Sequence, residues 1–177
     1  MGKADQKIIL ERYQVYPRTL CFVTHGNDVL LLHGAPDKRI WPNRCNGVGG
    51  HIEPGEDVYN AAMREIVEET GLPTRCLQLR GIVHVTLPER QPGIMLFVFT
   101  AEALHRSFVP SPEGSLEWVP RDHLLEYDLV EDLPVLLPRI LTSAQDAPPF
   151  FAHYTYDNTD RLQITFADAA AAAASAC

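Results

Sequence analysis

Hydrophobic residues near the start of the chain follow the pattern of β-strands. The runs Arg18–Thr24 and Asp28–Leu32 are rich in aliphatic residues, and His25-Gly26-Asn27 between them has the composition of a tight turn. The sequence therefore predicts a β-hairpin. The segment that follows, as far as Gly50, is rich in Gly, Pro and Asn, which favours a loop over a regular strand.

The apolar spacing becomes that of a helix over Asp57–Glu69. At about 100° per residue, one arc collects the apolar side chains of Tyr59, Ala62, Met63 and Ile66. Gly71 and Pro73 come directly after this segment, and both are typical of the end of a helix.

Strand-like and helix-like runs continue through the second half of the chain. Leu77–Leu87, Gly93–Ala101 and Ser115–Val119 have strand patterns, and the second is apolar on both faces, which predicts a central strand. Helices are predicted over Arg121–Tyr127 and Asp132–Thr142, where the early Pro134 is tolerated in the first turn.

A closing hairpin is predicted from Phe150–Tyr156 and Arg161–Phe166. Mixed strands and interspersed helices predict an α/β (α+β) fold with a single domain over residues 1–166. The alanine-rich segment 167–177 is predicted to be a disordered tail.

Composition and charge narrow the classes of partner. The 177 residues include 15 Lys and Arg against 23 Asp and Glu, a formal charge of −8 that repels a polymeric nucleic acid. The longest apolar run, Ile94–Phe99, is far too short to span a membrane. An anionic substrate would therefore need a local positive charge, most simply a divalent cation.

The four cysteines, at positions 21, 45, 76 and 177, lack the spacing of a metal site. The first ten residues lack the apolar core of a signal peptide. Both observations predict a reduced, cytoplasmic protein.

Three glutamates crowd one side of the predicted helix, at the rim where the buried face meets solvent. Glu65, Glu68 and Glu69 are neighbours at i, i+3 and i+4, and each like-charge pair costs roughly 0.2–0.5 kcal/mol on an isolated helix. Arg64 can offset part of this repulsion, whereas hard divalent cations would offset more. Glu56, at the helix start, can lean toward the same cluster. A merely solvated acidic helix face is the alternative interpretation.

The spacing of these acids favours the binding of divalent cations over a merely solvated helix face. Residues 50–72 fit the pattern Gx5Ex7REUxEExGU, where U is aliphatic, at Gly50, Glu56, Arg64, Glu65, Ile66, Glu68, Glu69, Gly71 and Leu72. This stretch resembles the signature of the Nudix hydrolases, which cleave nucleoside diphosphates linked to another moiety.

The resemblance implies an α/β/α sandwich with a central mixed sheet, and a loop, helix and loop motif that holds Mg²⁺ or Mn²⁺. It also implies attack of water on a phosphorus of a pyrophosphate linkage. By position, it implies metal ligands at Glu65, Glu68 and Glu69, a supporting acid at Glu56, a carbonyl contact from Gly50, and a structural partner in Arg64.

Residues outside the signature resemble the branch that hydrolyses oxidised purine nucleoside triphosphates. Asn46 matches a residue that reads the base there, although a turn residue is an equal alternative. Asp132 matches a base-binding acid, with Glu131 as a substitute for its missing neighbour; capping of the next helix is the alternative. Cys45 stands where that branch often has Trp, and Val130 replaces its stacking aromatic.

A further acid is expected near the metal. Glu113, five residues before Trp118, matches a metal ligand of that branch, and Glu117 competes with it. His33 and His51 are weaker candidates.

Trp41 and Pro42 could line a nucleotide pocket, although an aromatic residue in a loop more often packs.

Together these features predict a Mg²⁺-dependent pyrophosphohydrolase that converts a nucleoside triphosphate, with 8-oxo-dGTP a candidate, to monophosphate and pyrophosphate. The partner would be a small-molecule nucleotide, and the protein a monomer or homodimer. Hydrolysis of ADP-ribose, nucleotide sugars or dinucleoside polyphosphates is the nearest alternative. A non-catalytic nucleotide-sensing module is a third.

Overall fold

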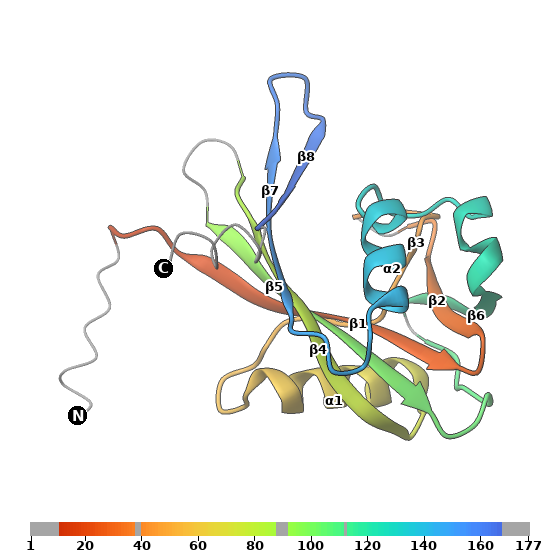
Figure 1. The fold of residues 1–177 in the computed structure, drawn as a ribbon. Helices are drawn as coiled ribbons and strands as arrows, with labels where there is room; N and C mark the ends of the chain where they lie inside the picture. Colours follow the sequence, from red (N-terminus) through yellow and green to blue (C-terminus); the bar gives the residue numbers. More distant parts are fainter. Residues whose placement is uncertain (1–10, 38–39, 88–91, 112, 168–177) are drawn as a thin grey trace.

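A computed structural model describes residues 11–37, 40–87, 92–111 and 113–167 of the chain, with a mixed sheet between two α-helices (Figure 1). The strands are β1 (Val15–His25), β2 (Asp28–Gly34), β3 (Cys45–Asn46), β4 (Thr74–Val85), β5 (Gly93–Ala103), β6 (Gly114–Pro120), β7 (Phe150–Tyr156) and β8 (Leu162–Phe166). The helices are α1 (Val58–Thr70), the short 3₁₀ helix η2 (Arg121–Glu126) and α2 (Leu133–Thr142).

The sheet runs in the order β3-β2-β1-β5-β4-β7-β8, and β6 pairs with β2. The pairs β1–β5 and β4–β7 are parallel, and the other strand pairs are antiparallel. This arrangement confirms the mixed sheet. β7 and β8 form the predicted closing hairpin.

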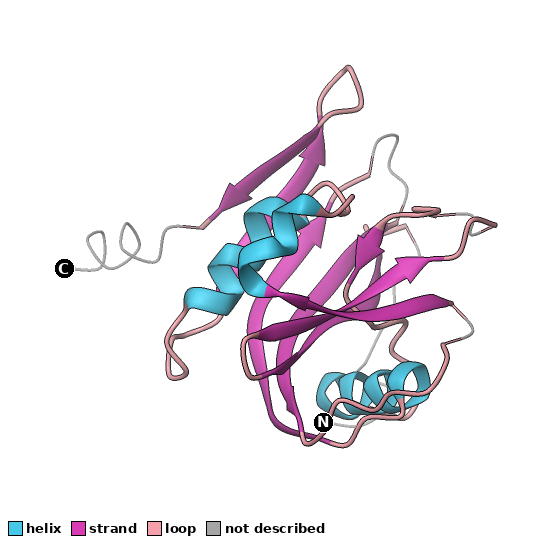
Figure 2. Ribbon diagram, turned by 90° about the vertical axis from the view of Figure 1, so that its right-hand side faces the viewer, coloured by secondary structure: helices cyan, strands magenta, loops and turns pink. Residues whose placement is uncertain are grey.

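Side chains of β1 alternate between two cores because successive strand residues point to opposite faces. Leu20 and Phe22 pack in the cluster that contains the apolar face of α2, whereas Cys21 and Val23 pack in the cluster that contains α1. The two helices thus cover opposite faces of the sheet (Figures 1 and 2), which confirms the α/β/α sandwich.

Several local predictions need correction. The segment from Arg121 forms a 3₁₀ helix rather than an α-helix, and β4 begins three residues earlier than expected. A register shift lies near Cys76, whose φ is 53°, and such a bulge interrupts the alternation from which strands are predicted. Tyr59, placed on the buried arc, is exposed in the first turn of α1.

The C-terminal boundary also differs. Ala167 still donates its N–H to the carbonyl of Phe151 and so extends the last hairpin. The rest of the predicted disordered tail, 168–177, lies outside the described residues. Among the described residues, no helix is long and apolar enough to cross a membrane, and Cys21, Cys45 and Cys76 are free thiols.

A separation between β1 and β2 shapes the site. The two strands pair only beside their turn, at Thr24–Val29 and His25–Asp28. Farther along β1, the loop before α1 takes the place of β2: the N–H of Thr19 donates to the carbonyl of Gly50 (2.9 Å). The loop at Gly50, where the signature begins, is thereby held against the sheet.

Candidate active site

The ends of helix α1 are fixed by local sequence. Asp57 caps its start, because Oδ1 accepts hydrogen bonds from the backbone N–H groups of Tyr59 and Asn60, both at 2.9 Å. Gly71 ends it with a φ of 67°, in the left-handed region that glycine adopts without strain. Ala62 and Ile66 anchor the helix to the sheet. These constraints set the position of the acidic face.

The three acids of α1 differ in exposure. The side chain of Glu65 is 13% exposed and that of Glu68 is 58% exposed, whereas Glu69 is 6% exposed and belongs to the buried part of the helix. The sequence pattern placed all three at the rim of the helix. Glu69 is buried instead, because it lies within one turn of the buried Ile66, on the same side of the helix.

Arg64 links the acids of the signature. Its guanidinium makes two bonds to Glu56, Nη2 to Oε1 at 2.6 Å and Nε to Oε2 at 3.1 Å. Its Nη1 donates to Glu65 at 2.8 Å and to Glu68 at 3.1 Å, and Nη2 also donates to the carbonyl of His51 at 3.0 Å. One cation therefore ties the helix to the loop before it.

These contacts explain the charge balance of the helix. Hydrogen bonds from Arg64 lower the pKa of Glu56, and the bonds to Glu56 and Glu65 raise the pKa of Arg64. Arg64 thus offsets more of the repulsion between the carboxylates than the four-residue spacing to Glu68 alone predicted.

Gly50 lies directly against the acidic face. A β-carbon at this position would lie 2.5 Å from Oε1 of Glu65, so only glycine allows the loop to approach the carboxylate this closely. The backbone of Gly50 and the carboxylate of Glu65 are therefore neighbours. The Gly50 carbonyl also accepts the N–H of Thr19.

The donor chemistry of this region fits a hard divalent cation. Carboxylate oxygens of Glu65, Glu68 and Glu69 together with a loop carbonyl are the ligand types that Mg²⁺ and Mn²⁺ prefer. Within the described ranges, no three acidic, histidine or cysteine side chains already form a cluster around one point. Arg64 instead bonds two of the acids, so ligation would require their side chains to turn.

The structure separates the two candidates for a further acid. Glu113 lines the same pocket as Gly50 and Glu69. Glu117 bonds elsewhere, to Nε2 of His33 at 3.0 Å and to the hydroxyl of Tyr127 at 2.9 Å. The position of Glu113 in the pocket favours it over Glu117 as the further acid. Its role at the metal stays a prediction.

We expect Glu113→Gln to lower the rate of hydrolysis by roughly 10- to 100-fold, the effect of weakening the surroundings of a metal site. Steady-state rates over a titration with Mg²⁺ would measure it. Glu117→Gln is the matched control and should leave the rate and the Mg²⁺ dependence unchanged. The reverse result for the two variants would assign the role to Glu117.

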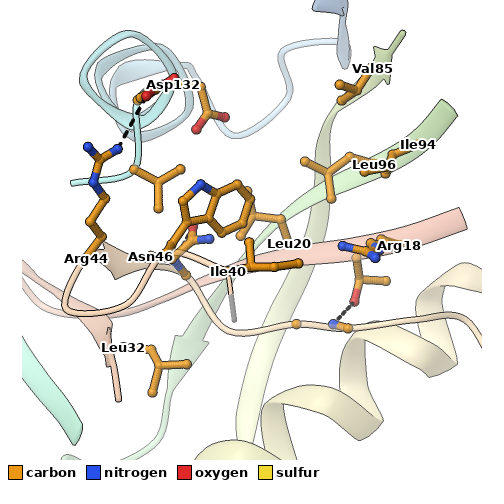
Figure 3. A pocket seen from close by; sticks show the side chains of 18 of the residues that line it. Arg18, Leu20, Leu32, Ile40, Arg44, Asn46, Val85, Ile94, Leu96 and Asp132 are labelled. Atoms are coloured by element: carbon orange, nitrogen blue, oxygen red, sulfur yellow. Dashed lines mark hydrogen bonds and ion pairs between the residues drawn. The ribbon is translucent and has the colours of Figure 1, made fainter. Parts of the chain in front are cut away.

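A pocket of about 480 Å³ adjoins the acidic face. Its floor comes from the sheet, where Leu20, Ile94 and Leu96 point into the cavity (Figure 3). Asn46 from β3 and Asp132 from the start of α2 line it together, although they are far apart in the sequence. The sequence predictions thus converge on one cavity.

The hydrogen bonds of Asn46 and Asp132 bear on their alternative roles as a turn residue and a helix cap. Oδ1 of Asn46 accepts the N–H of Gly47 (2.8 Å), as a turn residue does, and Asn46 also reaches the pocket. Asp132 makes no side-chain cap to α2, which removes the capping alternative for this residue. Glu131 lines the pocket and pairs with Arg44 at 3.5 Å.

Asp132 is a buried carboxyl group. Burial raises its pKa from 3.8 to about 6, and the neighbouring Asp132 charge, together with burial, raises the pKa of Tyr154. Because the folded pKa exceeds the unfolded value, the stability associated with the protonated group is complete below about pH 3.8. It is lost as the pH rises through about 6.

We therefore expect Asp132→Asn, which cannot ionise, to raise the free energy of unfolding at pH 8 by on the order of 2 kcal/mol relative to the unmodified protein. The difference should shrink toward zero at pH 4. Urea unfolding across this range would measure it, with Asp146→Asn, at an exposed position, as a control that should show no such trend. A difference independent of pH would contradict the role of ionisation.

Several pocket residues were not predicted from sequence, among them two arginines and a tyrosine. Arg18 and Arg44 bring positive charge to the cavity, and Tyr154 lies beside Asp132. The alternation of β1 could have placed Arg18 on the same face as Leu20, but only the tertiary structure shows that this end of the face lines a pocket. Nε of Arg18 donates to Nε2 of His51 at 3.1 Å.

Comparison with known proteins places this geometry in a family. The model of the NUDIX domain family matches residues 16–140. The chain is 26% identical over 144 residues to the oxidized purine nucleoside triphosphate hydrolase of Mus musculus, over 81% of this chain and 88% of the mouse protein. It is 30% identical over 138 residues to the NAD-capped RNA hydrolase NudC of Deinococcus radiodurans, over 73% of this chain but 44% of NudC.

A solved structure shows the same fold. The crystal structure of a MutT protein from Bacillus halodurans aligns with a TM-score of 0.73 and 26% identity, over 86% of this chain and 97% of that protein. The chain belongs to the Nudix family. It is a hydrolase that acts on phosphoric anhydrides, in a family that generally depends on divalent metals and uses small nucleotide substrates.

Proposed function

We propose that this protein is a Mg²⁺-dependent pyrophosphohydrolase that cleaves a purine nucleoside triphosphate, with 8-oxo-dGTP a candidate substrate, to the monophosphate and pyrophosphate. One observation carries the proposal: a single pocket joins the acidic face of the signature, at Gly50 and Glu69, to two base-binding candidates, Asn46 and Asp132. A single nucleotide molecule could thus contact both the acidic face and the two base-binding candidates. The likeness to the mouse hydrolase, whose name states this substrate class, supports the assignment.

Under this proposal the residues of the site have three roles: to hold the cation, to supply orientation and charge, and to bind the base. Glu65, Glu68 and Glu69 would hold the cation, with Gly50 contributing its carbonyl. The chemistry that a bound divalent cation supplies is polarisation of phosphoryl oxygens, activation of water and neutralisation of the leaving phosphate.

The protein supplies orientation and charge around that chemistry. Arg64 fixes Glu56 and holds Glu65 and Glu68 beside the loop, so it is a positioning residue. Arg18 contributes a fixed positive charge to the pocket wall beside His51, where it would attract a polyphosphate. Asn46 and Asp132 would bind the edge of the base.

A panel of nucleotides tests the substrate class. Purine and pyrimidine triphosphates, 8-oxo-dGTP, ADP-ribose and a dinucleoside tetraphosphate would each be incubated with the protein and Mg²⁺, and the products resolved by chromatography. We expect the highest kcat/KM for a purine triphosphate, with monophosphate as the nucleoside product. A clear preference for ADP-ribose would contradict the proposal and favour the alternative substrate class.

A further inference from the structure

Trp41 presents an aromatic surface to the pocket. It lies in the loop between β2 and β3, lines the cavity and is 45% exposed, although a side chain of this size gains most from burial. Its φ is 52°, a left-handed conformation that is costly for any residue with a β-carbon. This large apolar ring thus lies outside both hydrophobic cores and on a strained backbone.

The loop that carries Trp41 is held to the sheet by its backbone. The N–H of Asn43 donates to the carbonyl of Gly34, and the N–H of Gly34 donates to the carbonyl of Arg44, each at 3.0 Å. The N–H of Arg44 also donates to the carbonyl of Trp41 at 3.3 Å. Because these bonds close the loop onto the end of β2, the backbone that carries the indole is fixed against the sheet.

The other Tyr, Phe and Trp side chains that line the pocket are Tyr154, which is 3% exposed, and Tyr156, which is 36% exposed, so both are less exposed than Trp41. Val130 is 4% exposed and its N–H is bonded to the carbonyl of Cys45. The sheet floor is aliphatic, with Leu20 and Leu96 pointing into the cavity (Figure 3). Neither surface offers a π-system to a base.

We propose that Trp41, in the β2–β3 loop, is the surface on which the substrate base stacks. The inference rests on the proposed function. Trp41 would contact the face of the base, while Asn46 and Asp132 contact its edge. Stacking tolerates any base because each has a π-face, and it favours the larger purine. Trp41 thus sets affinity, whereas the polar pair selects the base.

Fluorescence can test stacking without turnover. The chain has two tryptophans, and Trp118 does not line the pocket: its Nε1 donates to the carbonyl of Arg106 at 2.9 Å. In Trp118→Phe, emission reports on Trp41 alone. Titration of this variant with dGTP after chelation of divalent cations should quench the emission, whereas inorganic tripolyphosphate should not. Equal quenching by both would overturn the stacking role.

Kinetics provide a second test that does not depend on Trp118→Phe folding normally. We expect Trp41→Ala to raise KM for a purine triphosphate by roughly tenfold, the typical effect of losing one stacked base, with kcat changed less than about twofold. Trp41→Phe should recover most of the affinity. Tyr16→Ala, which removes an exposed aromatic outside the pocket lining, is the matched control.

Different results would overturn the stacking role of Trp41 and the proposed function. If the unmodified protein hydrolyses purine triphosphates and Trp41→Ala has an unchanged KM, the stacking inference is overturned and the proposed function stands. If the unmodified protein hydrolyses no nucleoside triphosphate, the proposed function is contradicted, and with it the inference that rests on it.

Discussion

Replacing Glu68 by glutamine is expected to lower kcat/KM by at least about 100-fold, because under the proposed function Glu68 would be an anionic metal ligand, whose loss would remove several kcal/mol of transition-state stabilisation. The fold should survive, since the side chain is 58% exposed and the change is isosteric. Rates at saturating Mg²⁺ and a thermal melt would measure both effects.

Glu126→Gln is the matched control for this substitution, because Glu126 is an exposed glutamate on η2 outside the pocket lining. It should leave the rate unchanged. Glu68 is a cleaner test than Glu69, whose burial means that Glu69→Gln could act on folding as well as on activity. Full activity of Glu68→Gln would remove Glu68 from the metal site.

Asp132→Ala is expected to lower kcat/KM for the preferred purine triphosphate by roughly 10- to 100-fold, with a much smaller effect on poor pyrimidine substrates. A buried polar site rejects analogues because its own groups are left unpaired, and one such contact contributes about 1–3 kcal/mol. Steady-state kinetics on both classes of base would measure the difference.

Asp128→Ala provides the comparison for this effect. Asp128 is an exposed carboxylate in the same loop, 3.9 Å from Arg44, and it does not line the pocket. Its removal should alter purine and pyrimidine hydrolysis little. An equal loss on all bases in Asp132→Ala would show that Asp132 supports the fold rather than base selection.

Local sequence was sufficient to predict helix α1. Asp57 and Gly71 mark its two ends by well-understood capping chemistry, and a period of 3.6 residues identifies Ala62 and Ile66 as its buried side. The same local spacing brought the acids of the signature together. Such features depend on residues a few positions apart, so they are readable without the fold.

Features that depend on distant segments could not be predicted. The early separation of β1 from β2 lets the loop at Gly50 pair with Thr19, and nothing in either segment alone signals this partner. The convergence of Asn46 and Asp132 was a hypothesis drawn from the resemblance. The presence of Arg18 and Arg44 in the same cavity follows only from the packing of the sheet.

The central claim is that water attacks a phosphorus of the triphosphate in a reaction that requires a divalent cation. Hydrolysis of a purine triphosphate in ¹⁸O-labelled water, followed by mass spectrometry of the products, tests it most directly. We expect nucleoside monophosphate and pyrophosphate as products, with one ¹⁸O atom incorporated per turnover into one of the two. We expect no reaction after chelation. Release of orthophosphate with nucleoside diphosphate, or labelled products that persist after exhaustive chelation, would contradict it.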